Sequence, residues 1–271
     1  MIGFFDSGLG GLTILKEVVK ILPEYSYIYL GDNARTPYGS RSQEIIYKFT
    51  VEGVEELFRR DAELVVLACN TSSSAALRKI QREFLQKHYS EKRVLGIIIP
   101  TAEEIGRFTN TREIGVLATE ATVNSLTYQK EINKFFPEIK VYQQACPLLV
   151  PIIEAGEIEQ KNLDLAIEKY LNQLFSKSRK IDTIILGCTH YAIIEDKIKK
   201  YLSLGIKVIS QGPIIAEKLR NYLARHPEIE NKLSKTGKRI FLTTEDSERV
   251  KNLSQIFYGE QIAITIINIG P

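Results

Sequence analysis

The sequence predicts an α/β protein of two similar parallel-sheet domains that face each other across a cleft. Short, continuous apolar runs alternate with longer segments whose apolar residues recur every three or four positions. This alternation is typical of parallel strands that are covered by helices on both faces. In addition, two strand-like segments of the first half have close counterparts in the second half, which indicates that the halves share one design.

In the first half, four continuous apolar runs border turn residues and are therefore expected to be strands. They cover 1–5, 27–30, 64–68 and 94–99. The segments between them place apolar residues on one helical face. The expected helices cover 12–21, 45–59 and 73–88.

The second half repeats two of these strand ends. Residues 114–119 resemble 2–7, and residues 184–189 resemble 65–70. Because both pairs are separated by nearly the same number of positions, we expect them to be equivalent strands of two α/β halves. A further apolar run over 262–269 predicts the last strand of the first half.

The boundaries between the halves are expected where the chain crosses from one to the other. Pro100 and Gly212-Pro213 mark these crossovers. The expected domains are 1–98 plus 211–271, and 99–210.

Composition excludes several functional classes. Of 271 residues, 36 are Lys or Arg and 33 are Asp or Glu, so the net charge of +3 is too balanced to indicate a nucleic-acid-binding surface. The longest apolar run, 94–100, is far too short to span a membrane. The chain reaches the carboxylate of Asp6 without a basic start, so we expect no signal peptide and a cytoplasmic protein. The expected partner is a small molecule, with no nucleic acid and no membrane.

The three cysteines, Cys69, Cys146 and Cys188, are too few and too scattered for a disulfide scaffold. No C-x-x-C pair occurs, and the histidines show no metal-ligand spacing, so no metal site is expected. Cys146 lies in an apolar stretch without polar neighbours and is expected in the core.

Cys69 and Cys188 each end an apolar strand and begin a helix. A helix N-terminus favours the thiolate, so such a position can lower a thiol pKa from about 8.5. A single free cysteine is usually a buried, inert residue, but two at equivalent strand ends favour a function. Ligands of parallel sheets bind beyond the carboxyl ends of the strands, where polar residues gather in this sequence. They are Asp6, Ser7, Asp32, Asn70, Thr71, Thr119, Thr189 and His190.

The turn from Asp6 to Gly11 is rich in glycine, but it lacks the dinucleotide-binding fingerprint because Thr13 stands where the third glycine belongs. Two interpretations stay open. In one, Asp6 or Ser7 caps the following helix. In the other, backbone N–H groups and Ser7 hold a carboxylate, and Asp6 is free for proton transfer.

Two opposed thiols without a nucleotide motif, a metal cluster or a pyridoxal-lysine context suit proton transfer at carbon. One thiolate would remove a proton from one face of the substrate carbon, and the opposite thiol would deliver one to the other face. A proton beside a carboxylate is very weakly acidic. The site must therefore stabilise a carbanion-like state with backbone N–H and hydroxyl donors in a water-poor cleft. No cofactor is expected.

These motifs resemble the cofactor-independent aspartate/glutamate racemase family, and within it the glutamate racemases. The resemblance is in order and in register from residue 6 to about 215. It rests on four segments: 6–11, 31–39, 68–71 and 187–191. It implies two facing α/β domains of flavodoxin- or Rossmann-like architecture, interconversion of L- and D-glutamate for peptidoglycan, and a homodimer.

The resemblance also implies residue roles. Cys69 would act on D-glutamate with the help of Asp6, and Cys188 would act on L-glutamate with the help of His190. Other residues would bind the carboxylates and the amine of the substrate. They are Ser7, Tyr38, Gly39, Asn70, Thr71, Thr119, Thr122, Glu154 and Thr189.

The sequence departs from the family pattern at three places. Ala192 replaces a usual proline, which affects the start of the following helix. In the loop 118–122, Ala118 stands where glycine is commoner, and Glu120 would be unfavourable beside an anionic substrate unless it points away. Only five residues precede Asp6, so we expect no dependence on a cell-wall precursor as activator.

Three alternatives remain at this point. A racemase of another amino acid, such as aspartate, is the nearest, although His190 favours glutamate because the aspartate enzymes tend to carry a carboxylate there. A decarboxylase of the same fold would lose one of the two cysteines. A two-lobed amino-acid binding protein with structural cysteines would exchange no substrate proton.

Overall fold

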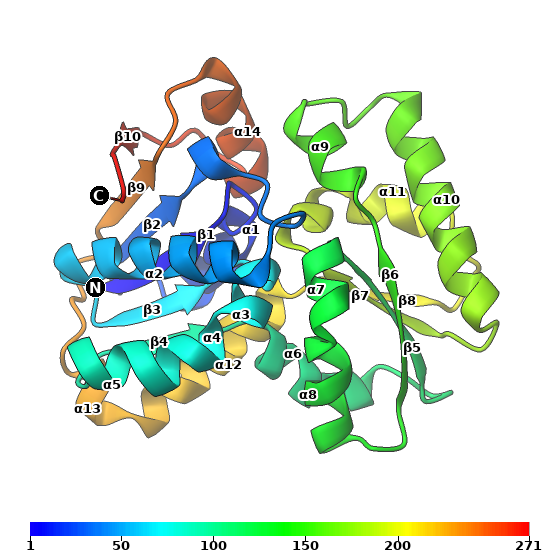
Figure 1. Cartoon of the computed structure of the whole chain (residues 1–271), viewed down its shortest axis with the longest axis horizontal. Helices are drawn as coiled ribbons and strands as arrows, with labels where there is room; N and C mark the ends of the chain where they lie inside the picture. Colours follow the sequence, from blue (N-terminus) through cyan, green and yellow to red (C-terminus); the bar gives the residue numbers. More distant parts are fainter. Residues whose placement is uncertain (271) are drawn as a thin grey trace.

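Two parallel sheets form the two halves of the molecule (Figure 1). The computed structural model describes residues 1–270. The larger sheet has the strand order β10-β9-β2-β1-β3-β4, the smaller has the order β6-β5-β7-β8, and every pairing is parallel. The prediction of an α/β protein with two parallel-sheet halves is confirmed.

The strands are short, as the apolar runs predict. Those of the larger sheet are β1 (Ile2–Asp6), β2 (Tyr27–Gly31), β3 (Leu64–Leu67), β4 (Arg93–Gly96), β9 (Arg239–Thr243) and β10 (Ile264–Ile266). Those of the smaller sheet are β5 (Glu113–Ala118), β6 (Lys140–Ala145), β7 (Thr183–Gly187) and β8 (Lys207–Ile209).

Helices connect successive strands. Those before β5 are α1 (Leu12–Ile21), η1 (Asn33–Arg35), α2 (Gln43–Arg59), α3 (Asn70–Ala75), α4 (Leu77–Lys79), η2 (Ile80–Phe84), α5 (Leu85–His88), α6 (Ile98–Glu104) and η3 (Ile105–Arg107). Those after β5 are α7 (Glu120–Ser125), α8 (Thr127–Phe135), α9 (Leu149–Glu154), α10 (Lys161–Lys177), η4 (Thr189–Ile194), α11 (Glu195–Lys200), α12 (Gly212–Arg225), α13 (Pro227–Glu230) and α14 (Glu248–Tyr258).

The two resemblances between the halves fall on equivalent strands. β1 lies between β2 and β3, and β5 lies in the same way between β6 and β7. The pairing register is also the same, because Gly3 pairs with Val65 while Gly115 pairs with Ile184. The segments ending in Cys69 and Cys188 therefore leave their sheets at matching places.

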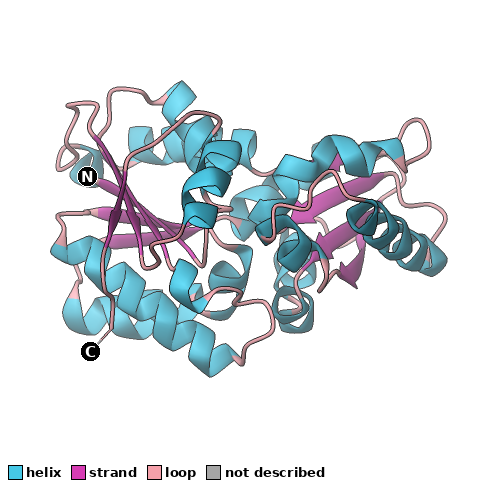
Figure 2. Cartoon of the chain, turned by 90° about the horizontal axis from the view of Figure 1, so that it is seen from above, coloured by secondary structure: helices cyan, strands magenta, loops and turns pink. Residues whose placement is uncertain are grey.

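Helices cover both faces of each sheet, so successive side chains of a strand enter different clusters (Figure 2). On β1, Phe4 belongs to the cluster that includes residues of α1, α12 and α14, whereas Phe5 belongs to the cluster that includes residues of α2. On β7, Leu186 belongs to the cluster that includes residues of α10, and Ile185 belongs to the cluster that includes residues of α6 and α8. Each such fully buried side chain stabilises the fold by about 1.5–3 kcal/mol.

The chain crosses between the halves through α6 and again just before α12, and these two helices pack against each other. The strand predicted over 94–99 is too long, because β4 ends at Gly96 and Ile98 begins α6. Ile98 is also buried, and a short buried run does not distinguish a strand from a helix. Pro100 therefore lies in the first turn of α6, where its missing N–H costs no hydrogen bond.

Two further predictions need correction. The helix expected over 73–88 begins at Asn70, breaks at Ala76 and contains a π-helical segment, η2. The run over 262–269 forms a strand only at Ile264–Ile266. The apolar pattern of the sequence does not indicate β6, β8 or β9. β6 is a half-buried edge strand without a continuous apolar run.

The larger sheet consists of strands from 1–98 and 211–271, and the smaller sheet consists of strands from 99–210. The exact domain boundaries stay a prediction. Among residues 1–270, none of the helices combines the length and the apolar character that crossing a membrane requires.

Candidate active site

The carboxyl ends of the strands from both sheets meet around one small cavity. Its volume is about 20 Å³, enough for one or two water molecules. Ten of the thirteen predicted site residues line it: Ser7, Tyr38, Gly39, Cys69, Asn70, Thr71, Thr119, Cys188, Thr189 and His190. The other three, Asp6, Thr122 and Glu154, lie behind this lining. Sequence reasoning therefore located the cavity and most of its wall.

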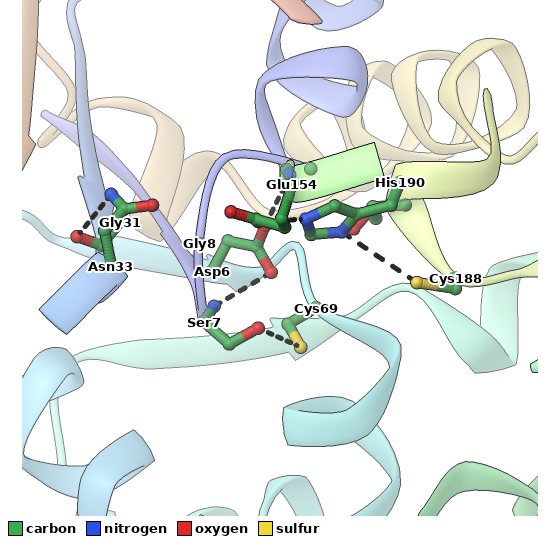
Figure 3. A network of polar contacts seen from close by, with 12 residues as sticks. Asp6, Ser7, Gly8, Gly31, Asn33, Cys69, Glu154, Cys188 and His190 are labelled. Carbon is green, nitrogen blue, oxygen red and sulfur yellow. Dashed lines mark hydrogen bonds and ion pairs between the residues drawn. The ribbon is translucent and has the colours of Figure 1, made fainter. Parts of the chain in front are cut away.

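Cys69 follows β3 and caps the N-terminus of α3, where its Sγ accepts the N–H of Ser72 at 3.5 Å. The Ser7 hydroxyl lies 3.4 Å from the same sulfur (Figure 3). The expectation of a lowered thiol pKa is wrong for this cysteine. Burial, followed by the nearby Asp6 carboxylate, raises the pKa of Cys69 to about 12, and the hydrogen bonds from Ser7 and Ser72 only partly oppose this shift.

Asp6 lies at the end of β1 and is fully buried. Its two oxygens accept the backbone N–H of Gly11 at 2.6 Å and of Ser7 at 2.9 Å. Burial raises the pKa of this carboxyl, although His190 and the two N–H groups favour the charged form. The carboxylate thus holds the glycine-rich turn in shape, and it also lies next to Cys69. Asp6 therefore supports the turn before α1 but does not cap the helix, which has no side-chain cap, and its role in proton transfer stays a prediction.

Cys188 follows β7 and precedes the 3-10 helix η4, which contains Ala192. Its Sγ lies 3.9 Å from His190 Nδ1, and His190 Nε2 lies 2.7 Å from Glu154 Oε1 (Figure 3). Burial disfavours a charged imidazole, but Cys188 and Glu154 together raise the pKa of His190 well above its usual value. Burial likewise opposes ionisation of Glu154, but the hydrogen bond from His190 and the nearby positive charges lower its pKa.

Glu154 is thus placed differently from its predicted role in substrate binding. Its carboxylate faces the rear of the His190 ring and does not line the cavity. The side chain comes from the end of α9, and its other oxygen, Oε2, lies 3.6 Å from Arg249 Nη1. Glu154 therefore reaches the cavity only through His190.

The loop that carries Tyr38 and Gly39 is held by Asp32, which lies at the end of β2 and is completely buried. Asp32 accepts hydrogen bonds from Arg35 Nε at 2.6 Å, from Thr244 Oγ1 at 2.9 Å and from the Tyr38 hydroxyl. Asp32 was recognised in the sequence as a polar strand end, but not as the support of this loop.

Both polar atoms of the Asn70 side chain form hydrogen bonds within the protein. Its Nδ2 donates to Gln211 Oε1 at 2.6 Å, and its Oδ1 accepts from the Tyr128 hydroxyl at 2.7 Å. Gln211 in turn donates to Thr101 Oγ1 at 3.0 Å. All four side chains are buried. Sequence reasoning missed Gln211 and Tyr128, because each is a single polar residue whose partners are distant in the chain.

Thr119 forms part of the contact between the halves over the cavity. Its Oγ1 lies 3.0 Å from Thr71 Oγ1 and 3.1 Å from Thr122 Oγ1, and it caps the N-terminus of α7. Thr122 is buried and supports Thr119 without lining the cavity. Glu120 is exposed and borders a neighbouring outer pocket, so it does point away from the cavity.

Cys146 is buried, as predicted, and burial raises the pKa of its thiol. All three cysteines are free. Within residues 1–270, no group of three or more His, Cys, Asp or Glu side chains is arranged to hold a metal ion.

A larger cavity of about 450 Å³ lies behind Cys188 and Thr189, between α1, η4, α12 and α14. It does not reach Cys69. A reaction that uses both thiols must take place in the small cavity, because Cys69 and Cys188 both line it.

Comparison with known proteins agrees with this geometry. The family model described as Asp/Glu/Hydantoin racemase matches residues 10–219. The chain belongs to the Asp/Glu/hydantoin racemase family. The predicted family and the predicted class of enzyme, an isomerase, are confirmed, and a member of this family acts on a small-molecule substrate.

Individual family members match nearly the whole chain. A glutamate racemase of Jannaschia sp. (strain CCS1) is 37% identical over 276 aligned residues, which cover 98% of this chain and 99% of that protein. The crystal structure of a glutamate racemase isoform from Bacillus anthracis matches with a TM-score of 0.88 and 33% identity, covering 99% of this chain and 97% of that chain. Glutamate racemase from Francisella tularensis in complex with D-glutamate matches with a TM-score of 0.85 and 32% identity, covering 98% and 97%.

Proposed function

We propose that the protein interconverts L- and D-glutamate by a two-base mechanism without a cofactor. The observation that supports this most directly is the pair of thiols, Cys69 and Cys188, which reach one cavity from equivalent strand ends of two halves. The names of its relatives support glutamate as the substrate.

In the direction from L- to D-glutamate, the Cys188 thiolate removes the Cα proton and the Cys69 thiol delivers a proton to the opposite face. The reverse direction exchanges these roles. His190 assists Cys188 through its contact of 3.9 Å, and Asp6 assists Cys69 from behind the cavity. The carbanion-like intermediate is stabilised by neutral donors of the cavity wall, which cost no reorganisation as charge develops.

The neutral donors Ser7, Thr71 and Thr189 bind the substrate carboxylates and amine, together with backbone N–H groups near Gly39 and Asn70. Asn70 contributes its backbone, because its side-chain amide is already bonded to Gln211 and Tyr128. Glu154 and Thr122 act behind the wall, through His190 and Thr119.

A cavity of about 20 Å³ is too small to hold glutamate, so the substrate enters when the halves separate. Separation breaks contacts that bridge the halves, including Ala121 N–H to the Gly39 carbonyl at 3.0 Å. Closure around the substrate then excludes water, which strengthens the electrostatic interactions inside.

In the cell, we propose that D-glutamate is supplied for peptidoglycan. A site that needs two free thiols suits the reducing cytoplasm. The homodimer stays a prediction from the family resemblance.

Racemisation in deuterated water tests the two-base mechanism. D-glutamate formed from L-glutamate should carry deuterium at Cα from the first turnover, while the remaining L-glutamate stays mostly unlabelled at early times. Product that retains the original hydrogen would indicate a single base. Absence of any Cα exchange would indicate a binding protein.

A further inference from the structure

Two-base racemisation leaves the enzyme in a different state from the one in which it started. After L-glutamate becomes D-glutamate, Cys188 holds the proton it removed and Cys69 has lost its own. Another turnover in the same direction requires the reverse arrangement. Cys188 must therefore lose a proton and Cys69 must gain one before the next L-glutamate reacts.

The side chain of Cys188 begins a chain of polar contacts that leads away from the cavity (Figure 3). Cys188 Sγ lies 3.9 Å from His190 Nδ1, and His190 Nε2 lies 2.7 Å from Glu154 Oε1. His190 and Glu154 are 3% and 6% exposed. The second oxygen of Glu154 lies 3.6 Å from Arg249, whose side chain is 43% exposed. These contacts lead from the buried thiol to the solvent.

We propose that His190 and Glu154 carry the proton of Cys188 to solvent at Arg249 between turnovers, which resets the two thiols. This inference rests on the proposed function. The relay begins from a neutral His190 that carries its proton on Nε2. The Cys188 S–H bond breaks as an N–H bond forms at His190 Nδ1, and the N–H bond at Nε2 breaks as an O–H bond forms on Glu154, which then gives its proton to a solvent water. Rotation of the imidazole ring by about half a turn brings its remaining N–H group back to the Glu154 side before the next turnover. Cys69 takes a proton from water that enters after the product leaves, so the protons balance.

The position of Glu154 favours this role over a role in substrate binding. Its carboxylate does not line the cavity, so the substrate does not occupy it. A carboxylate that bonds the far nitrogen of an imidazole is placed to accept the proton that the ring releases there. The Cys69 side has no equivalent chain, because both Asp6 oxygens accept backbone N–H groups and Asp6 is fully buried. The relay runs in reverse when D-glutamate is the substrate.

Two measurable rates distinguish the return of the two thiols to their starting protonation states, called the reset here, from the racemisation of the substrate. Net flux is the initial rate from pure L-glutamate at a saturating concentration, and it needs one reset per turnover. Exchange flux is the rate at which labelled L-glutamate becomes D-glutamate in an equal mixture of both enantiomers at the same total concentration. Exchange flux needs no reset, because each conversion of D-glutamate restores the enzyme form that accepts L-glutamate.

The test compares the ratio of net flux to exchange flux among variants. Glu154→Gln keeps an oxygen that can bond His190 but cannot accept a proton, so this ratio should fall on the order of tenfold or more. Arg249→Gln removes a positive charge that lowers the pKa of Glu154, so Glu154 accepts the proton of His190 more readily and the ratio should rise roughly threefold, the effect of about half a pKa unit. Glu56→Gln is the matched control: Glu56 is also 6% exposed and ion-paired, but lies on α2, and its variant should keep the wild-type ratio.

The outcomes are distinguishable. If Glu154→Gln lowers both fluxes by the same factor, Glu154 serves only to position His190, and the proposal is wrong. An unchanged ratio in a folded Glu154→Gln variant would also contradict the proposal, because Cys188 would then exchange its proton directly with water in the cavity. If Glu154→Gln does not fold, the Arg249→Gln ratio decides alone. Absence of racemisation by the wild-type protein would instead contradict the proposed function.

Discussion

Gly10 and His190 approach so closely that a Cβ atom on Gly10 would lie 2.5 Å from His190 Nδ1 and 2.9 Å from the His190 backbone nitrogen. The same atom would lie 2.4 Å from Thr189 Oγ1. Gly10 belongs to the turn that Asp6 holds in the larger-sheet half, whereas His190 follows β7 in the other half. The glycine therefore allows the two halves to meet next to Cys188.

The first prediction concerns this close approach. Gly10→Ala should displace Thr189 and His190, because their side chains and the His190 backbone nitrogen leave no space for a methyl group. A displacement of about 1 Å at a reacting group can lower the rate on the order of 100-fold. We expect a loss of this size in kcat/KM, measured from both enantiomers. Since L- and D-glutamate have equal free energies in solution, the two values must remain equal in every variant.

Thermal unfolding provides the control for Gly10→Ala. It distinguishes a local displacement at the site from a loss of the fold, because one hydrophobic cluster contains buried residues of both halves. A variant with normal kcat/KM would contradict the close packing of Gly10 against His190.

The sequence made the centre of the site predictable because its signals are local. Cys69 and Cys188 end apolar strands of matching register, so the topology of parallel sheets places each of them at the carboxyl edge of its own sheet. Gln211 and Tyr128 lack such a signal. Each is one polar residue beside ordinary neighbours, and its importance arises from hydrogen bonds to residues far away in the chain.

Thiol acidity was not predictable for a different reason. A helix N-terminus follows from local sequence, and Cys69 does cap α3. The degree of burial and the nearby Asp6 carboxylate depend on the packing of the whole half, and their effect on the pKa of Cys69 outweighs that of the helix terminus.

The boundary between β4 and α6 was not predictable from the sequence, because the residues on both sides of it are buried and apolar.

The second prediction compares the three cysteines. Cys69→Ser and Cys188→Ser should each abolish racemisation almost completely, because a serine hydroxyl is far less acidic than a thiol. Cys146→Ser should retain catalysis, but it places a hydroxyl in an apolar environment at a cost of about 1–3 kcal/mol in the free energy of unfolding. Chirality-resolved turnover and denaturant unfolding measure both effects. Near-normal racemisation by either cavity variant would exclude the paired thiols as bases.

The third prediction concerns substrate length. Aspartate lacks one methylene, so a cavity wall whose donors fit both carboxylates of glutamate leaves one donor group unpaired. Such a loss costs about 1–3 kcal/mol, equivalent to roughly 10–200-fold. We expect kcat/KM for glutamate to exceed that for aspartate by this factor. Comparable values for the two amino acids would show that the distal carboxylate is not recognised.

The fourth prediction concerns cofactors. Exhaustive dialysis against a chelator, with a thiol reductant present, should leave the activity intact. Alkylation should abolish it, because the thiolate is the reactive form. Protection by D- or L-glutamate during alkylation should accompany this loss, since both thiols line the cavity. Activity that disappears on chelation and returns with added metal would contradict the cofactor-independent mechanism.

The last prediction uses the pKa of Cys69. Burial and Asp6 raise this pKa to about 12 in the folded protein, whereas an unfolded thiol titrates near 8.5. The folded state thus binds this proton more tightly than the unfolded state. The protonated Cys69 thiol therefore contributes fully to the free energy of unfolding below about pH 8.5, and this contribution is lost as the pH rises through about 12.

Between these two pH values, the free energy of unfolding of the wild-type protein should fall by up to about 1.4 kcal/mol per pH unit more than that of Cys69→Ser. Denaturant unfolding of both proteins at several values between pH 8 and pH 10.5 measures the difference. Tyrosines and lysines titrate in both proteins and cancel in the comparison, so the remaining slope belongs to the thiol. Parallel stability curves would mean that the Cys69 thiol ionises equally well in the folded and unfolded states, and that the cavity does not hold it protonated.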